Sequence, residues 1–119
     1  MLDDGSSMAF LDVRPVFPGH CLLVPRDHLE TLADIPDNLV GALFTDARRL
    51  AIAVERAMDA DGTFVAMNNR ISQSVPHAHV HVVPRRRKDG LRGFFWPRQK
   101  YESDEQMAQV AGAIRAQLG

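Results

Sequence analysis

The segment His77-Ala78-His79-Val80-His81-Val82-Val83 constrains the fold more than any other part of the chain. Imidazoles and small or branched apolar side chains alternate with a period of two, which is typical of a β-strand with two unlike faces. The valines would lie on a buried face. The three histidines would lie together on the other face, roughly 7 Å apart along the strand. The pattern predicts a strand over residues 75–83 that ends at Pro84.

Shorter apolar runs predict three more strands, at residues 8–13, 20–24 and 63–68. The first two are separated by residues 14–19, where two prolines and a glycine interrupt any ladder and predict a turn. Because this connection is short, the flanking strands are expected to pair in antiparallel fashion.

Residues 39–58 follow a different period, with apolar side chains at three- and four-residue steps. This spacing predicts a long helix with one apolar stripe, and Asp61-Gly62 marks its end. Ser103-Asp104-Glu105-Gln106 resembles a capping box and predicts a C-terminal helix through Leu118. We therefore expect an α+β fold, with a mainly antiparallel sheet, one long helix and one C-terminal helix.

Length and composition exclude several classes of protein. The 119 residues fit one domain, expected over residues 8–119 after a flexible N-terminus at residues 1–7. The net charge of −1 gives no reason to expect general binding to nucleic acid or to an anionic membrane. No apolar run approaches the ~20 residues of a membrane span, and the N-terminus lacks the order of a signal peptide. Cys21 is the only cysteine, which excludes an internal disulfide and is compatible with the expected cytoplasmic location.

Three alternating histidines admit four interpretations. Chance exposure on a half-buried strand explains one histidine better than three. A zinc site would use neutral imidazoles, but three along one strand span too far to converge easily on one ion. A pH-sensing or binding patch is the third interpretation. The fourth is nucleophilic attack on phosphorus by a neutral imidazole, with protonated neighbours offsetting the phosphate charge. Only this chemistry uses all three histidines and the polar loop before them.

Two motifs together resemble the signature of the histidine triad (HIT) family. One is the run from Gln73 to Arg85, in which histidines alternate with apolar residues. The other is Phe10-Leu11-Asp12-Val13 followed by residues 18–28, which is similar to the nucleotide-binding strand pair of that family. The resemblance covers roughly residues 8–118. It implies a HIT-like fold and a nucleotide hydrolase or nucleotidyl transferase that works through a covalent nucleotidyl-histidine intermediate.

The resemblance implies a role for each matching position. His79 would be the nucleophile, and its other ring nitrogen would donate to a backbone carbonyl near His77. His81 would contact the phosphate, while His77 and His20 would support the imidazole cluster. The other implied roles concern substrate: Asp12 would bind the ribose, Phe10, Leu11 and Val13 would wall the base pocket, Gln73 and Ser74 would hold the phosphate or leaving group, and Asn68 would line the same pocket.

The resemblance further implies a homodimer that acts on a conjugate of AMP or GMP without metal or cofactor. Its reaction would be of the phosphoramidase, dinucleotide polyphosphate hydrolase or adenylylsulfatase type. Two alternatives stay open at this point. One is a nucleotide-binding regulatory module with little catalysis, and the other is a metalloenzyme built on the same histidines.

Some features depart from the family pattern or have no assigned role. The loop at residues 68–73 is shorter than usual and carries Ser72 where glycine is common. The chain also starts almost at its first expected strand, whereas relatives often have a longer N-terminal segment. The basic run Arg85-Arg86-Arg87-Lys88 would form a solvated face or guide anionic substrates. Phe94-Phe95-Trp96 would serve as core, dimer contact or lid.

Overall fold

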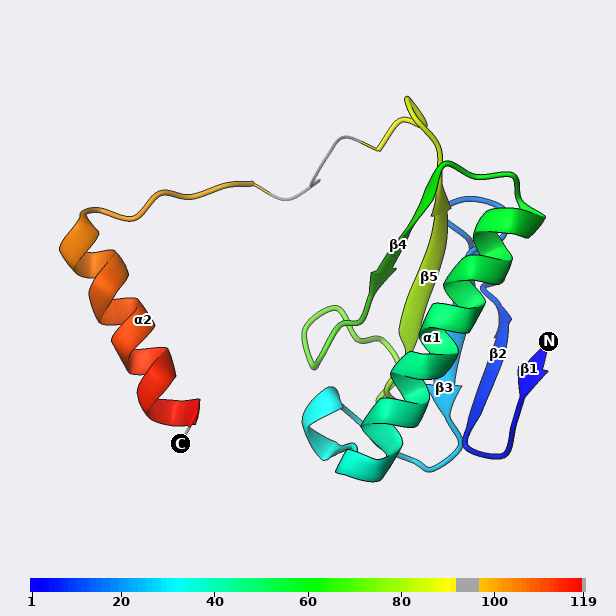
Figure 1. The fold of residues 1–119 in the computed structure, drawn as a ribbon, viewed down its shortest axis with the longest axis horizontal. Helices are drawn as coiled ribbons and strands as arrows, with labels where there is room; N and C mark the ends of the chain where they lie inside the picture. The colour runs from blue at the N-terminus through cyan, green and yellow to red at the C-terminus, as the bar shows by residue number, and fades with distance from the viewer. Residues whose placement is uncertain (92–96, 119) are drawn as a thin grey trace. The chain divides into compact units, whose positions relative to one another are not determined.

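The protein was analysed as a computed structural model that describes residues 1–91 and 97–118. The strands form one five-stranded antiparallel sheet in the order β1-β2-β3-β5-β4. Figure 1 shows that α1 lies along one face of this sheet. The elements are β1 (Leu2–Asp3), β2 (Ser7–Leu11), β3 (Cys21–Pro25), the short 3₁₀ helix η1 (Leu32–Asp34), α1 (Asp37–Ala57), β4 (Gly62–Ala66), β5 (Val80–Arg85) and α2 (Asp104–Leu118).

The hydrophobic core lies between α1 and the sheet. Leu43 and Leu50 belong to the predicted apolar stripe and are buried against the strands. Leu23 of β3 and Val80 and Val82 of β5 are at most 1% exposed. Each such side chain contributes about 1.5–3 kcal/mol by leaving water. Because strand side chains alternate, this packing leaves the opposite face of β3 and β5 free of the helix.

The predicted α+β class, antiparallel sheet, long helix and C-terminal helix are confirmed. The strand expected over residues 75–83 begins later than predicted, because only residues from Val80 onward join the ladder. A tight turn, in which the His77 amide donates to the Val75 carbonyl at 2.8 Å, takes the preceding residues out of the sheet. His77 and His79 therefore stand just before the strand, and His81 stands within it. The strand also continues past the predicted stop at Pro84, since Pro84 and Arg85 pair with Thr63 and Gly62 of β4.

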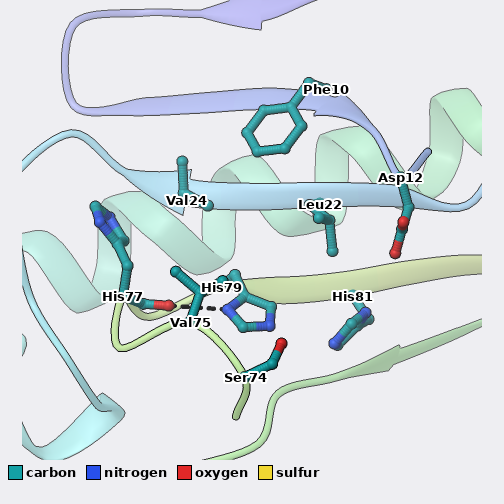
Figure 2. Close-up of a pocket in the computed structure, with 9 residues that line it drawn as sticks. All are labelled: Phe10, Asp12, Leu22, Val24, Ser74, Val75, His77, His79 and His81. Atoms are coloured by element: carbon teal, nitrogen blue, oxygen red, sulfur yellow. Dashed lines mark hydrogen bonds between the residues drawn. The ribbon is translucent and has the colours of Figure 1, made fainter. Parts of the chain in front are cut away.

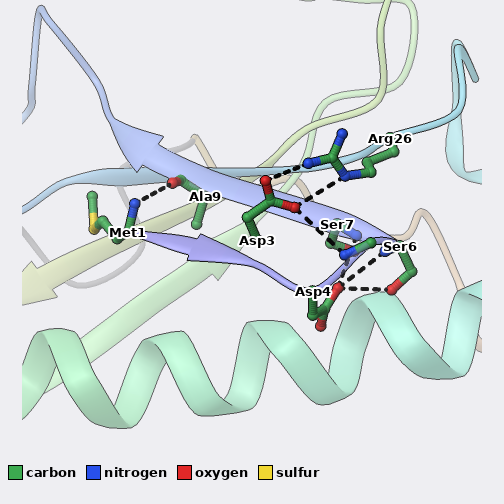
Figure 3. Close-up of polar contacts among 8 residues, drawn as sticks. Met1, Asp3, Asp4, Ser6, Ser7, Ala9 and Arg26 are labelled. Atoms are coloured by element: carbon green, nitrogen blue, oxygen red, sulfur yellow. Dashed lines mark hydrogen bonds and ion pairs between the residues drawn. The ribbon is translucent and has the colours of Figure 1, made fainter.

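Residues 1–7, for which the sequence predicts a flexible N-terminus, make several contacts with the sheet. Leu2–Asp3 forms β1 beside β2, and Ser7 already belongs to β2 and is 2% exposed. The Met1 ammonium donates to the Ala9 carbonyl, and the Arg26 guanidinium pairs with the Asp3 carboxylate (Figure 3). Backbone pairing and side-chain contacts thus join this segment to β2 and to Arg26.

The chain divides into two compact units, Met1–Asp89 and Gly90–Gly119. The single domain expected over residues 8–119 stays a prediction. In the second unit α2 begins after Ser103, whose hydroxyl accepts from the Gln106 amide at 3.0 Å. This is the cap predicted from the sequence. Over residues 1–91 and 97–118, neither helix has the combination of length and apolar character that crossing a membrane requires.

The basic run at the end of β5 holds the fold together. Arg85 pairs with Asp89 through Nε and Oδ2 at 2.6 Å, and the Arg86 guanidinium donates to the Met58 carbonyl at the end of α1. The Arg87 amide donates to Asp61 Oδ2 at 2.8 Å. Two of the four cationic side chains are therefore engaged in structural contacts instead of forming only a solvated face.

A pair of carboxyl groups connects the N-terminal turn to α1. Asp46 of α1 is 3% exposed, and its Oδ2 has no donor beside it among the described residues. Asp4 receives the Ser6 and Ser7 amides at 3.1 Å each (Figure 3). Burial is the main cause that raises the pKa of Asp46, and the nearby Asp4 raises it further, whereas Arg49, whose Nη1 lies 3.1 Å from Asp46 Oδ1, lowers it. The pKa of Asp4 is lowered, first by the neighbouring Asp46 carboxyl and then by the hydrogen bonds from Ser7 and Ser6.

This pair makes a prediction about stability and pH. Because the pKa of Asp46 is raised in the folded protein, Asp46 contributes most to the free energy of unfolding below its ordinary pKa of 3.8. That contribution is lost as pH rises through the folded-state pKa. Each unit of raised pKa corresponds to ~1.4 kcal/mol. Asp46→Asn, which cannot ionise, should therefore gain stability relative to wild type as pH rises above about 4.

Urea unfolding of both proteins between pH 4 and pH 8 measures this effect. Glu55→Gln changes an exposed carboxylate of the same helix and is the matched control, with a constant difference from wild type expected. A difference between wild type and Asp46→Asn that stays equally constant across this range would contradict a raised pKa of Asp46 in the folded protein.

Candidate active site

A pocket of about 450 Å³ opens on the sheet face that α1 leaves free. Figure 2 shows its side chains in front of the strands, with the helix behind them. The antiparallel register explains the gathering, because Phe10 pairs with Leu22 and Leu22 pairs with His81 across β2, β3 and β5. The lining residues are Phe10, Asp12, Leu22, Val24, Ser74, Val75, His77, His79 and His81.

Three of these residues were not among the sequence-predicted site positions. Leu22 and Val24 are alternate residues of β3, and the two-residue period places them on one face. A signal was present in the sequence, since the face of β3 that bears Leu22 must be the face of its neighbour His81 once the strands pair. Val75 follows Ser74 in the loop and is 58% exposed at the pocket edge.

The orientation of His79 is fixed by a backbone carbonyl. Its Nδ1 lies 2.8 Å from the carbonyl oxygen of His77, the contact expected from the sequence. A carbonyl only accepts hydrogen bonds, so Nδ1 carries the proton and Nε2 keeps its lone pair. Figure 2 shows this second nitrogen facing the space between Ser74 and His81. The pocket thus contains a neutral imidazole with a free lone pair.

A second chain of hydrogen bonds fixes the proton on His81. The Val16 amide donates to Nδ1 of His20 at 3.1 Å, so the proton of His20 stands on Nε2. That nitrogen lies 2.9 Å from Nδ1 of His81 and donates to it. Neutral His81 therefore carries its own proton on Nε2. His79 offers a lone pair and His81 a donor, with their ring centres 5.0 Å apart.

Burial is the main cause that lowers the pKa of both His20 and His81. His20 is 4% exposed, and the neighbouring imidazoles of His79 and His20 lower the pKa of His81 further. A pKa lowered from the ordinary 6.5 leaves both rings mainly neutral at pH 7. The expectation that imidazoles are protonated next to a bound phosphate stays a prediction.

His77 contributes mainly its backbone. Its ring turns away from His79, as Figure 2 shows, and its Nε2 donates to the Pro25 carbonyl at 2.9 Å. The ring also meets the edge of His28, with centres 5.3 Å apart. The imidazole cluster consists of His20, His79 and His81, and the ring of His77 stands outside it.

The other predicted residues occupy different places. Asp12 lines the pocket, and its Oδ1 accepts from the Arg14 amide at 2.9 Å. Leu11 alternates with Phe10 and is 56% exposed on the other side of β2. Gln73 uses its amide group within the loop, donating to the Glu30 carbonyl at 2.6 Å. Asn68 is exposed at the end of β4, Val13 is 94% exposed, and the expected roles of Phe94-Phe95-Trp96 lie outside the described residues.

Asp12, His20 and His81 offer ligand-type atoms that all lie within 4.8 Å of one another. Such a set could hold a divalent cation by spacing alone. Each ligating imidazole nitrogen must present a lone pair, however, and Nε2 of His20 carries a proton while the Val16 amide occupies Nδ1. A cation there would have to break both hydrogen bonds, so the cluster is arranged for proton placement instead of metal binding.

An antiparallel sheet with a histidine cluster on its open face defines a known class of protein. The HIT domain family matches residues 1–88, and the chain belongs to this family. In a crystal structure, a HIT family protein from Bacillus subtilis superposes with a TM-score of 0.89 at 30% identity, covering 100% of this chain and 86% of that one.

Two relatives extend the comparison. An uncharacterized HIT-like protein of Saccharolobus solfataricus is 39% identical over 110 residues, which cover 90% of this chain and 78% of the relative. The adenosine 5'-monophosphoramidase of Saccharomyces cerevisiae is 38% identical over 108 residues, covering 88% of this chain and 65% of the relative. The chain thus spans somewhat less than two thirds of the length of this second relative.

Proposed function

We propose that the chain hydrolyses or transfers the nucleotidyl group of a nucleotide conjugate through a covalent nucleotidyl-His79 intermediate. The observation that carries this assignment is the hydrogen bond between Nδ1 of His79 and the carbonyl of His77, at 2.8 Å. It leaves Nε2 as a nucleophile directed into a pocket large enough for a small ligand. Kinship with a phosphoramidase of the same family supports the same chemistry.

In the first step, the Nε2 lone pair of His79 attacks the α-phosphorus. The N–P bond forms as the bond from phosphorus to the leaving group breaks. The leaving group departs with that electron pair and takes a proton from solvent, while Nε2–H of His81, whose orientation is fixed by His20, donates a hydrogen bond to a phosphoryl oxygen. The Ser74 hydroxyl stands at the same side of the pocket and donates a hydrogen bond to the departing atom.

In the second step, a water molecule enters on the vacated side and attacks phosphorus. The N–P bond breaks and its electron pair returns to Nε2 of His79. The water proton passes to solvent, so the enzyme regains its starting state with release of the nucleoside monophosphate. Another acceptor in place of water gives nucleotidyl transfer.

The opposite part of the pocket suits a nucleoside. Phe10, Leu22 and Val24 form an apolar wall that can take a base, with purine expected from the sequence resemblance. Asp12 lies between this wall and the histidines, and its carboxylate can accept hydrogen bonds from ribose hydroxyls. Base, ribose and phosphate thus each meet side chains of matching chemistry.

The charge of the pocket favours a leaving group with little negative charge. Among the nine described residues that line it, none is lysine or arginine, and Asp12 is acidic. A polyphosphate or sulfate leaving group brings charge that cationic side chains normally offset. An amine brings none, and the apolar surface of Val75 can contact its carbon atoms. We therefore favour phosphoramidates over dinucleotide polyphosphates and adenylyl sulfate.

Assembly and location remain predictions from the sequence, namely a homodimer in the cytoplasm. Self-association is supported by apolar side chains exposed at the sheet edge and on the outer side of α1. Val65 of β4 is 41% exposed, and Phe44 and Ile52 of α1 are 40% and 46% exposed.

Trapping the intermediate tests the proposed function. The protein is mixed with an AMP alkylphosphoramidate labelled at phosphorus, and the reaction is quenched in alkaline detergent within milliseconds. We expect label on the protein that survives base, is released by acid as a phosphorus–nitrogen bond should be, and maps to the peptide containing His79. Turnover without label on any histidine would exclude the covalent route. Binding of AMP with no turnover would instead identify a binding module.

A further inference from the structure

The loop that leads into the histidines is tied to the segment before α1 by two side-chain amides. Asn69 Oδ1 accepts from the Leu32 amide at 2.8 Å, at the start of η1. Gln73 Nε2 donates to the Glu30 carbonyl at 2.6 Å, while its Oε1 accepts from the Arg70 amide at 2.8 Å. These contacts join residues 37 and 43 positions apart in the chain.

The backbone between these two amides adopts an unusual conformation. Arg70 and Ser72 have φ angles of +72° and +58°, in the left-handed region that side chains with a Cβ rarely enter. Residues stay in such a region only when their surroundings hold them there. Among the described residues, the side-chain hydrogen bonds of this loop are those of Asn69 and Gln73. The two amides therefore hold the path of the shortened loop.

This path determines where Ser74 stands. Ser74 directly follows Gln73 and lines the pocket beside His79 and His81 (Figure 2). No hydrogen bond from another described residue holds its exposed hydroxyl, so the main chain sets the position of Cβ and, with it, the few positions that Oγ can take about χ1. A change at Gln73 is transmitted to that oxygen through a single peptide unit.

We propose that Asn69 and Gln73 are positioning residues that place the Ser74 hydroxyl for departure of the leaving group. This inference rests on the proposed function. Both hydrogen-bonding atoms of the Gln73 amide are already engaged, so direct contact with substrate, the role expected from the sequence, would break two hydrogen bonds. The two amides would therefore affect the first step of the reaction, in which the bond between phosphorus and the leaving group breaks.

Two substrates separate this role from a general structural one. An AMP alkylphosphoramidate has a poor leaving group that needs a hydrogen bond and a proton, whereas the p-nitrophenyl ester of AMP has a good leaving group that needs neither. We expect Gln73→Ala and Asn69→Ala to lower kcat for the phosphoramidate by about 10- to 100-fold. For the nitrophenyl ester, kcat should stay within about threefold, and KM should change little for either substrate.

Two conservative variants provide matched controls. Asn69→Asp keeps an oxygen that accepts from the Leu32 amide and should retain nearly full activity. Gln73→Glu keeps an acceptor for Arg70 but loses the donor to the Glu30 carbonyl, so it should behave like Gln73→Ala. Thermal unfolding of each variant reports whether the loss of activity follows a loss of folding.

A double-mutant cycle with Ser74→Ala gives the decisive result. If Gln73 acts through Ser74, the double variant should be no slower on the phosphoramidate than Ser74→Ala alone. The inference would be overturned if the rate losses of the two single variants multiplied in the double variant. It would also be overturned if a folded Gln73→Ala variant lost activity equally on both substrates. Either result would leave the proposed function intact. A wild-type protein that turns over neither substrate would overturn both.

Discussion

Replacing His79 by alanine is expected to lower kcat by about 10⁴- to 10⁶-fold, the range found when a catalytic nucleophile is removed. No neighbouring ring can take over the attack. Nδ1 of His81 accepts from His20 and its Nε2 carries a proton, while the ring of His77 is bound to the Pro25 carbonyl. The variant should still bind AMP, because Phe10 and Asp12 are unchanged. Steady-state kinetics and calorimetry measure the two effects separately.

His28→Ala is the matched control for this substitution. It removes an exposed imidazole that touches the edge of the His77 ring but is not among the pocket-lining residues. Its kcat should stay within about threefold of wild type, as for a surface change away from the reacting atoms. Turnover by His79→Ala at a tenth of the wild-type rate or faster would contradict nucleophilic catalysis by this residue.

Local periodicity was sufficient to predict most of the fold. The long helix follows from apolar residues at three- and four-residue steps, and the structure places it at Asp37–Ala57. The alternation from Val80 onward is a true strand, since Val80 and Val82 are buried and His81 faces the pocket. The same alternation misled at residues 75–79. Alternating side chains occur in any extended backbone, whereas membership of a sheet also requires hydrogen-bond partners.

The site could be predicted only in part, because its decisive contacts join distant residues. The bond between His20 and His81 spans 61 positions and exists because Leu22 and His81 are paired in the sheet. The tautomer of His20 depends on the backbone amide of Val16, and a backbone amide is present whatever the residue type, so the sequence does not reveal this contact. Whether Gln73 faces the substrate or its own loop likewise depends on where the Glu30 carbonyl lies. Sequence identifies the imidazoles, and the fold determines which of their nitrogens carry protons.

Gly19 connects the stability of the fold to the histidine cluster. It has a φ angle of +99° in the turn between β2 and β3 and directly precedes His20. A Cβ at this position would lie 2.6 Å from Cγ of Met58, at the end of α1, and 3.3 Å from Cγ of Pro84. A side chain at position 19 would therefore be unfavourable for two reasons: the backbone conformation suits glycine, and three segments approach one another closely there.

Gly19→Ala is expected to lower the free energy of unfolding by about 2–4 kcal/mol, the sum of a disfavoured φ and an overpacked contact. For a chain of this length, the midpoint of thermal unfolding should fall by roughly 10–20 °C. Any relaxation that moves the turn also displaces His20, whose Nε2 directs the proton of His81. Activity measured well below the unfolding midpoint should therefore fall too.

Gly41→Ala is the matched control, because it makes the same glycine-to-alanine change at a position where the added methyl group has space. Gly41 lies in α1 with no atom within 4 Å of an added Cβ, so alanine should raise stability by about 0.5–1 kcal/mol through its higher helix propensity. The two variants add the same methyl group with opposite expected signs. If Gly19→Ala were as stable as wild type, the turn would have another conformation open to it, and His20 would not be held by the close approach of Gly19 to α1.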